Sequence, residues 1–519
     1  MSIKLQDAAI SDLLGGLDAG QFTVTKLVET YLKRIEQVNP RLHAVSQINK
    51  DALTIAGERD QERSQGTARG ILHGIPILVK DLFMTEDSLE STNGCSGLVG
   101  AVPSFEATVI RRLRAQGAVL LGKTVGTQWA NYRNPRLGLG GWSAVGGQCL
   151  APYHEAQDPA GSSSGSAVAA SLGLSAATLG TETSGSLSTP AQSSAVVSIK
   201  PTVGLTSRYG VYSVSEWQDT VGVLASSVRN AATVLTAIFG PDPNDAFTES
   251  DPRDSEDENA RKPPTDTNFA DACTSSGLKG KRIAVPRHLI PDDPVVNAAF
   301  DEALNVMTAQ GATIVDNVRF SEFDMNYSTS EALEWTLAFR IGLRENMRKT
   351  LSAYTTNPHE IKTLQDLIKY TQETDEEENE KRGVDEWLKC EELGQQYHPQ
   401  SAAVKKSQEW RNLMGLQIAE LLKRTECDLI FVPSSVDASA NIGGCPTVGV
   451  PLGFYPEDTP IERGKLSGLV ITGPRVPFGG LFVGRRWDDY DLIAAAFAYE
   501  QASQVRKQVN PIISPDAEL

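Results

Sequence analysis

The sequence has 519 residues, of which 40% are hydrophobic and 22% charged. These values are typical of a soluble globular protein with a large buried core. The formal net charge of −17 argues against a broad nucleic-acid surface, which would be basic.

The N-terminal 20 residues carry Asp7, Asp12 and Asp18 and lack a continuous apolar core, so they do not resemble a signal peptide. No run approaches the roughly 18–20 apolar residues that span a bilayer. The nearest, Ser166–Leu179, is rich in small residues and is expected to form a close-packed internal helix. We therefore expect a protein without a membrane span.

The six cysteines are scattered and form no CxxC pair, which argues against a zinc or redox site. Scattered cysteines in a chain of this length fit a reducing compartment. The sequence therefore predicts a cytoplasmic protein without a metal site.

The N-terminal segment, residues 1–65, is expected to be helical. Thr23 could cap a helix over residues 26–38, whose apolar residues recur at helical spacing. The apolar run 75–79 predicts a buried strand that ends at Lys80.

The catalytic core is expected over residues 66–249. Helices and short apolar strands alternate there, which is the α/β pattern. The predicted helices are 109–114 and 166–172, and the predicted strands are 118–121, 176–179 and 195–199.

Residues 250–266 are charged and proline-bearing, which predicts an acidic surface linker or insertion. Residues 281–286 resume the α/β pattern. Residues 330–425 are expected to form a helical region on the substrate side, with the acidic run 375–380 as a solvated face or loop between helices. Residues 426–519 would complete the core of a single domain that spans 1–519.

Two serine–glycine clusters, Gly161–Gly165 and Thr183–Ser186, flank an Ala/Leu-rich segment. Such clusters let the backbone approach a reacting ligand closely, and their N–H groups can stabilise an oxyanion. Ser162 and Ser186 are 24 residues apart. This spacing accommodates one helix and one strand, which would bring both clusters to one edge of a sheet.

Several motifs in order resemble the amidase signature family of serine hydrolases, and within it the peptide amidase-like subgroup of plants, fungi and bacteria. The two serine motifs, Asp158–Ser166 and Gly180–Thr183, carry most of the resemblance. The other matching segments are Gly74–Asp81, Ala107–Ile110, Gly122–Thr124, Gly141–Ser143, Asp219–Gly222, Pro446–Gly453 and Tyr499–Gln501. The resemblance implies the family's fold, a large mixed β-sheet covered by helices on both faces.

The resemblance also implies a catalytic triad, with Ser186 as nucleophile, Ser162 as a bridging serine held by a cis peptide, and Lys80 as base. A serine needs a base to become nucleophilic. Lysine is a base only when neutral, so its pKa must fall well below ~10.4, and burial next to the apolar Val79 would lower it.

The backbone N–H groups of Thr183, Ser184, Gly185 and Ser186 would form the oxyanion hole. We expect Ser163 to hydrogen-bond within the site and Asp81 to orient a loop. Phe83, Met84, Trp142 and Trp217 are candidates for the wall of the substrate pocket, and each could equally belong to the core.

A second interpretation of the first cluster uses the pattern G-x-S-x-G, the nucleophile elbow of α/β-hydrolases. Ser163 would then be the nucleophile, with His288, His359 or His398 as base. None of these histidines has a recognisable context, and this interpretation leaves Lys80 and the second cluster without a role.

The resulting prediction is a cofactor-independent amidase that hydrolyses a peptide C-terminal amide or a small aryl or alkyl amide through an acyl-enzyme. Three alternatives remain open: a glutaminase-type amidotransferase A subunit, a biosynthetic enzyme that transfers the acyl group to an amine, and a non-catalytic scaffold of the same fold. The expected partner is the amide substrate, with no nucleic acid, and a homodimer is possible.

Overall fold

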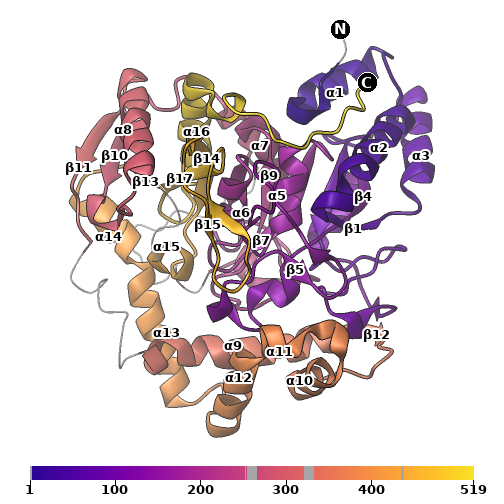
Figure 1. Cartoon of the computed structure of the whole chain (residues 1–519), viewed down its shortest axis with the longest axis vertical. Helices are drawn as coiled ribbons and strands as arrows, with labels where there is room; N and C mark the ends of the chain where they lie inside the picture. The colour runs from indigo at the N-terminus through magenta and orange to yellow at the C-terminus, as the bar shows by residue number, and fades with distance from the viewer. Residues whose placement is uncertain (1–2, 252, 254–265, 321–331, 434–437) are drawn as a thin grey trace.

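The computed structural model describes residues 3–251, 253, 266–320, 332–433 and 438–519 (Figure 1). A mixed sheet of eleven strands runs through the described part of the chain. In spatial order its strands are β1 (Val45–Ile48), β4 (Val119–Thr124), β2 (Pro76–Lys80), β7 (Ala177–Glu182), β9 (Thr220–Ala225), β8 (Val197–Lys200), β14 (Thr447–Phe454), β17 (Pro477–Val483), β13 (Leu429–Pro433), β10 (Arg282–Val285) and β11 (Thr313–Asp316).

The strand directions form two parallel groups joined by antiparallel pairs. Strand β2 is parallel to both β4 and β7, and β10 is parallel to both β11 and β13. Between them the pairs from β7 through β9, β8, β14 and β17 to β13 are antiparallel. This mixed sheet flanked by helices is the expected fold class.

Helices pack on the sheet and extend below it (Figure 1). Those that pack on the sheet or flank it are α1 (Ile10–Asp18), α2 (Val24–Leu42), α3 (Ala52–Ser64), α4 (Thr108–Ala115), α5 (Ser164–Ser171), α6 (Ser188–Ser193), α7 (Val228–Ile238), α8 (Pro294–Ala309) and α16 (Asp489–Ser503). The remainder are α9 (Ala332–Ser352), α10 (Leu364–Glu373), α11 (Asn379–Arg382), α12 (Asp385–Gln396), α13 (Ala402–Gly415), α14 (Gln417–Arg424) and α15 (Ala438–Ile442).

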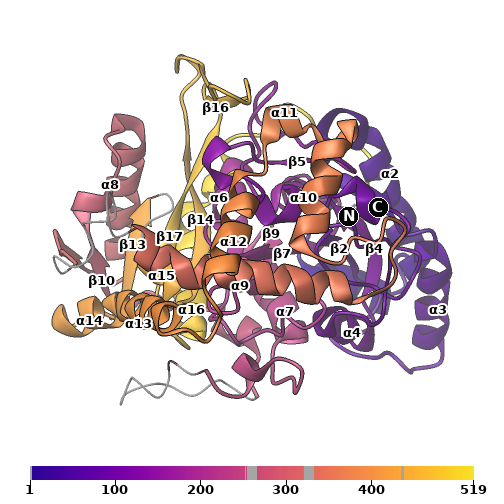
Figure 2. The same ribbon diagram turned by 90° about the horizontal axis from the view of Figure 1, so that it is seen from below.

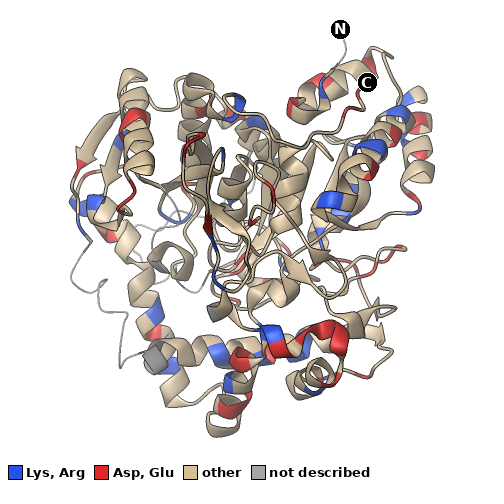
Figure 3. Cartoon of the chain, viewed as in Figure 1, with Lys and Arg blue, Asp and Glu red and all other residues tan. Residues whose placement is uncertain are grey.

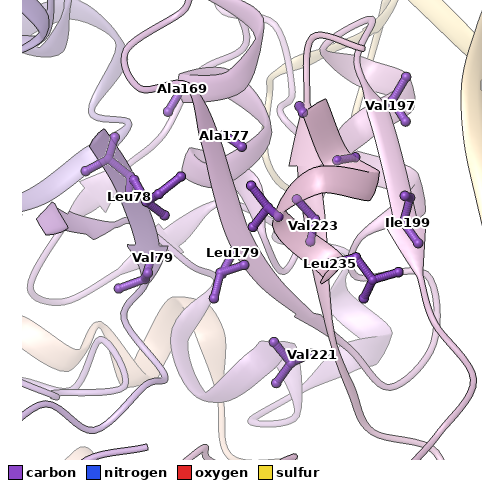
Figure 4. Close-up of a cluster of buried hydrophobic side chains, with 14 of the residues drawn as sticks. Leu78, Val79, Ala169, Ala177, Leu179, Val197, Ile199, Val221, Val223 and Leu235 are labelled. Carbon is purple, nitrogen blue, oxygen red and sulfur yellow. The ribbon is translucent and has the colours of Figure 1, made fainter. Parts of the chain in front are cut away.

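The core lies between the central strands and their helices. Val223 of β9 and Leu235 of α7 belong to one buried cluster (Figure 4). The next residue of β9, Leu224, belongs to a separate cluster with residues of α5 and α6. This alternation follows from the two-residue period of a strand. Both faces of β9 are buried, so its sequence is almost continuously apolar.

Most elements expected from the sequence are present with small shifts in their bounds. Thr23 caps α2, because its side chain accepts a hydrogen bond from Lys26 N. Of the two expectations for residues 166–179, the single internal helix is wrong, and the helix 166–172 followed by the strand 176–179 is confirmed: α5 ends at Ser171 and β7 begins at Ala177. The segment is buried throughout, and apolar content alone does not separate a buried helix from a buried strand.

The helices α9 to α13 form a layer at the bottom of the molecule as drawn in Figure 1, and Figure 2 shows this layer from below. Acidic residues gather near α11 in this layer (Figure 3), but the acidic run 375–380 is not wholly solvated. Glu377 is fully buried, and its carboxylate accepts hydrogen bonds from Ser96 and Gln128 in the N-terminal half of the chain. The prediction of a solvated run is therefore wrong for Glu377.

Most of the predicted linker 250–266 lies outside the described residues. Within the described part, Asp251 and Arg253 form a buried ion pair of 2.5 Å. These two residues are thus buried rather than on the surface. None of the described helices combines the length and the apolar content needed to cross a bilayer.

Candidate active site

The candidate site lies at the edge of the sheet where β2 and β7 end. These strands are parallel, with Val79 opposite Leu179, so their carboxyl ends lie side by side. Lys80 is the last residue of β2, and the second serine cluster follows the end of β7. Helix α5 and strand β7 separate the two serine clusters, as the 24-residue spacing predicts.

Hydroxyl groups surround the Lys80 amine. Its Nζ lies 2.7 Å from Ser162 Oγ, 3.2 Å from Ser163 Oγ and 3.1 Å from Thr181 Oγ1. The lysine side chain is fully buried. The structure therefore brings Lys80 and the first serine cluster into direct contact.

Burial lowers the pKa of Lys80 to about 7, because removal from water disfavours the ammonium. The negative charges of Asp219 and Glu182 act in the opposite direction and raise this pKa. The balance leaves a substantial neutral fraction near neutral pH, which is the form that can accept a proton.

The first serine cluster begins α5. The Gly161–Ser162 peptide bond is cis, and the carbonyl of Ser162 accepts a hydrogen bond of 2.9 Å from Thr127 N. A Cβ at Gly126 would lie 2.8 Å from Lys80 Cε and 3.1 Å from Ser162 O. Only glycine therefore lets the 125–127 backbone approach both Lys80 and Ser162 so closely.

The second serine cluster packs against the first. The carbonyl of Ser186 accepts a hydrogen bond of 3.0 Å from Ser163 N, and Ser186 is 5% exposed. Thr183 is also buried, whereas Ser184 is exposed and Gly185 has a φ of 76°. The loop thus turns back on itself between a buried strand end and the short helix α6.

Two carboxylates hold this loop, and the sequence interpretation gave neither a role. Glu182 Oε2 accepts hydrogen bonds from the backbone N–H groups of Leu187 and Ser188. Asp219 Oδ1 accepts a hydrogen bond of 2.6 Å from the Thr183 hydroxyl. Glu182 could have been recognised because it lies inside the second motif, while Asp219 reaches Thr183 only through the antiparallel pairing of β7 with β9.

Ser163 faces Lys80 rather than a histidine. Its hydroxyl donates to Thr181 O at 3.1 Å and lies close to Lys80 Nζ. A Cβ at Gly180 would lie 2.7 Å from Ser163 Oγ, so the glycine makes room for this serine.

The three histidines of the elbow hypothesis contact other parts of the chain. His288 packs against Phe320, His359 packs against Tyr370, and His398 accepts a hydrogen bond from Gln400 N. The geometry gives Ser163 a lysine neighbour, so it does not support the elbow hypothesis.

Asp81 contacts the loop that follows it. Its carboxylate accepts hydrogen bonds from the backbone N–H groups of Thr92 and Gly94 and from the Thr92 hydroxyl. This position agrees with a role in orienting that loop.

The four candidate wall residues lie in different places. Phe83 is fully buried in the main core, and Met84 lines a separate cavity of about 430 Å³. Trp217 packs edge-on against Phe247. Trp142 lines a small cavity together with Thr127, whose backbone N–H donates a hydrogen bond to Ser162 O.

The described residues contain no group of three or more His, Cys, Asp or Glu side chains suited to a metal ion. The six cysteines are all free and buried. The groups that contact the Lys80 amine are the hydroxyls of Ser162, Ser163 and Thr181, which are of a kind that can pass protons.

Comparison with known proteins agrees with this geometry. Residues 26–493 match the amidase family model. A putative amidase of Arthroderma benhamiae is 40% identical over 508 residues, covering 96% of this chain and 82% of the relative. A probable amidase of Arabidopsis thaliana is 34% identical over 513 residues, covering 98% of this chain and 92% of the relative.

Among solved structures, the native peptide amidase of Stenotrophomonas maltophilia aligns with a TM-score of 0.80 and 32% identity, over 97% of this chain and 98% of that one. Bacterial glutamyl-tRNA(Gln) amidotransferase A subunits also match, at 28–30% identity. By sequence and by structure, the chain belongs to the amidase family of amide-hydrolysing enzymes.

Proposed function

We propose that this protein hydrolyses a carboxamide through an acyl-enzyme on Ser186, with Ser162 and Lys80 as the proton relay. The observation that carries the proposal is the buried contact of 2.7 Å between Lys80 Nζ and Ser162 Oγ. A lysine with a pKa of about 7 can serve as a general base near neutral pH.

In the proposed mechanism, Ser186 Oγ attacks the amide carbonyl and its proton passes to Ser162 Oγ. The proton of Ser162 passes in turn to the neutral Lys80 amine. When the tetrahedral intermediate collapses, the relay returns a proton to the leaving ammonia or amine. Water then attacks the acyl-enzyme by the same route and regenerates Ser186.

The oxyanion of each intermediate would be held by the backbone N–H groups of Thr183, Ser184, Gly185 and Ser186. Support for this assignment comes from the rigidity of the loop. Glu182 and Asp219 bind its two ends, so the amides need little reorganisation when charge develops.

The proposed substrates are peptide C-terminal amides or small aryl or alkyl amides. The 32% identity with a peptide amidase over nearly the whole chain favours the first class. The amidotransferase alternative is tested by measuring glutamine hydrolysis with and without candidate partner subunits, because an A subunit would release ammonia from glutamine.

The proposal is tested by labelling with a fluorophosphonate serine probe and mapping the labelled peptide. We expect label on Ser186 in the wild type and strongly reduced labelling in Lys80→Ala. Lys123→Ala is the matched control, since Lys123 is equally buried but contacts Phe83 O and Ser91 Oγ. Label on Ser163, or no label on folded protein, would contradict the proposal.

A further inference from the structure

Three backbone N–H groups of the second serine cluster have no acceptor within the protein. No described residue accepts a hydrogen bond from the N–H of Ser184, Gly185 or Ser186. The next N–H group along the chain, that of Leu187, donates to Glu182 Oε2. The direction in which the three groups point therefore decides whether this loop can bind an oxyanion.

Gln218 contacts the peptide group that contains the first of these N–H groups. Its side-chain Nε2 donates a hydrogen bond of 3.2 Å to Thr183 O. The antiparallel pairing of Glu182 in β7 with Thr220 in β9 brings Gln218 beside the loop. Gln218 is 5% exposed, so the protein shields this contact from water.

The geometry of the peptide group links this contact to the Ser184 N–H. The peptide bond between Thr183 and Ser184 is trans and planar, so its C=O and N–H groups point in opposite directions. A donor that holds Thr183 O on one side therefore turns the Ser184 N–H to the other side. Asp219 binds only the Thr183 hydroxyl, which does not by itself fix this peptide plane.

The Gln218 side chain makes this contact at a cost to stability. Its Oε1 is buried and has no hydrogen-bond partner among the described residues. A buried polar atom without a partner is unfavourable, and packing alone would favour an apolar side chain at this position. The amide is therefore better explained by what it does to the loop than by its contribution to the core.

Resting on the proposed function, we propose that Gln218 is a positioning residue that directs the Ser184 N–H toward the oxyanion of the tetrahedral intermediate. Gln218 acts through the peptide group between Thr183 and Ser184. Its loss should weaken binding of the transition state rather than binding of the ground state.

The test is the kinetics of labelling of Ser186 by the fluorophosphonate, in which negative charge develops on the phosphoryl oxygen. Gln218→Met removes the donor and keeps an unbranched side chain of similar length. The limiting rate constant at saturating probe should fall about 10- to 100-fold, while the probe concentration that gives half of this rate should change less than about 3-fold. The acid limb of labelling should stay near pH 7, because Gln218 is not among the groups that shift the pKa of Lys80.

Asn230→Leu is the matched control. Asn230 is 1% exposed on α7, and its amide bonds two backbone groups away from the loop, Ala8 O and Ile10 N. This variant should lower the free energy of unfolding and leave both labelling constants of the folded enzyme unchanged.

A second variant covers the case in which Gln218→Met does not fold. Gln218→Glu keeps the shape of the side chain, and its carboxylate lacks the donor. Its limiting rate constant is compared with that of the wild type above about pH 9, because the added charge raises the pKa of Lys80. The same fall of about 10- to 100-fold is expected there.

The outcomes separate this inference from the proposed function. A wild-type limiting rate constant in folded Gln218 variants overturns the positioning role while Ser186 still labels. A change confined to the half-saturating concentration, or an acid limb that moves in Gln218→Met, also overturns it. Absence of label on Ser186 in the wild type overturns the proposed function itself, and the positioning role with it.

Discussion

The chemistry proposed for this site depends on one buried lysine. A surface lysine would be charged at neutral pH, but Lys80 is fully enclosed by hydroxyl groups and backbone, and its pKa falls to about 7. Lys123 on the neighbouring strand is also fully buried, and its pKa is lowered to about 8. The two lysines differ in their neighbours, because only Lys80 contacts the first serine cluster.

The pH dependence of kcat/KM tests this lysine. In the wild type we expect an acid limb near pH 7, because Lys80 is a base only when neutral. In Asp219→Asn the limb should move to lower pH, since Asp219 raises the pKa of Lys80 and its charge is removed. The maximal rate should also fall, because the substitution disturbs the hydrogen bond that the Thr183 hydroxyl donates to Asp219.

Glu216→Gln is the control for this experiment. Glu216 carries a carboxylate on the same loop but is exposed and pairs with Lys349, so the limb should not move. A limb that stays in place in Asp219→Asn would show that Asp219 does not act on the charge state of Lys80.

At the scale of elements, one buried carboxylate contributes to the contact between the helical layer and residues 96–133. Glu377 is the last residue of a short 3₁₀ helix (Asp375–Glu377). Its carboxylate accepts hydrogen bonds of 2.9 Å from Ser96 N and 2.7 Å from Gln128 Nε2, and it forms an ion pair with Arg133. The sequence shows only an acidic run, in which every carboxylate looks equally solvated. Only the packing of α10 to α12 against residues 96–133 buries one of these carboxylates, that of Glu377.

Removing this carboxylate should destabilise the protein. Glu377→Ala leaves Arg133 buried without its counter-charge, which costs about 3–5 kcal/mol in typical cases. Glu376→Ala, at the exposed neighbouring position, should change the free energy of unfolding by less than about 0.5 kcal/mol. Urea unfolding of the two variants measures both values, and equal values would contradict the docking role.

At the scale of the whole molecule, the two ends of the described chain meet near α2 (Figure 1). Arg34 is fully buried and donates to Gly173 O, Leu172 O, Ala517 O and the Glu518 carboxylate. Glu518 in turn accepts a hydrogen bond of 2.6 Å from Leu5 N. One arginine thus joins α2, the turn after α5 and the C-terminal segment.

Glu518→Ala tests this connection. The substitution removes an acceptor from a buried guanidinium and from Leu5 N, so stability should fall by about 1–3 kcal/mol. Glu155→Ala breaks the exposed ion pair with Arg41 and should cost less than about 1 kcal/mol. Chemical denaturation compares the two, and an equal loss would mean that the C-terminal contact adds no more than a surface pair.

The sequence alone determined the α/β class, the strand that ends at Lys80, the two serine clusters and the family, because these depend on local periodicity and on motifs. Only the tertiary structure decided which polar groups surround Lys80, that Asp219 binds Thr183, and that Glu377 is buried. Those contacts join residues tens to hundreds of positions apart, and no local pattern encodes them. Burial also sets the pKa of Lys80, since desolvation requires the whole fold around the amine.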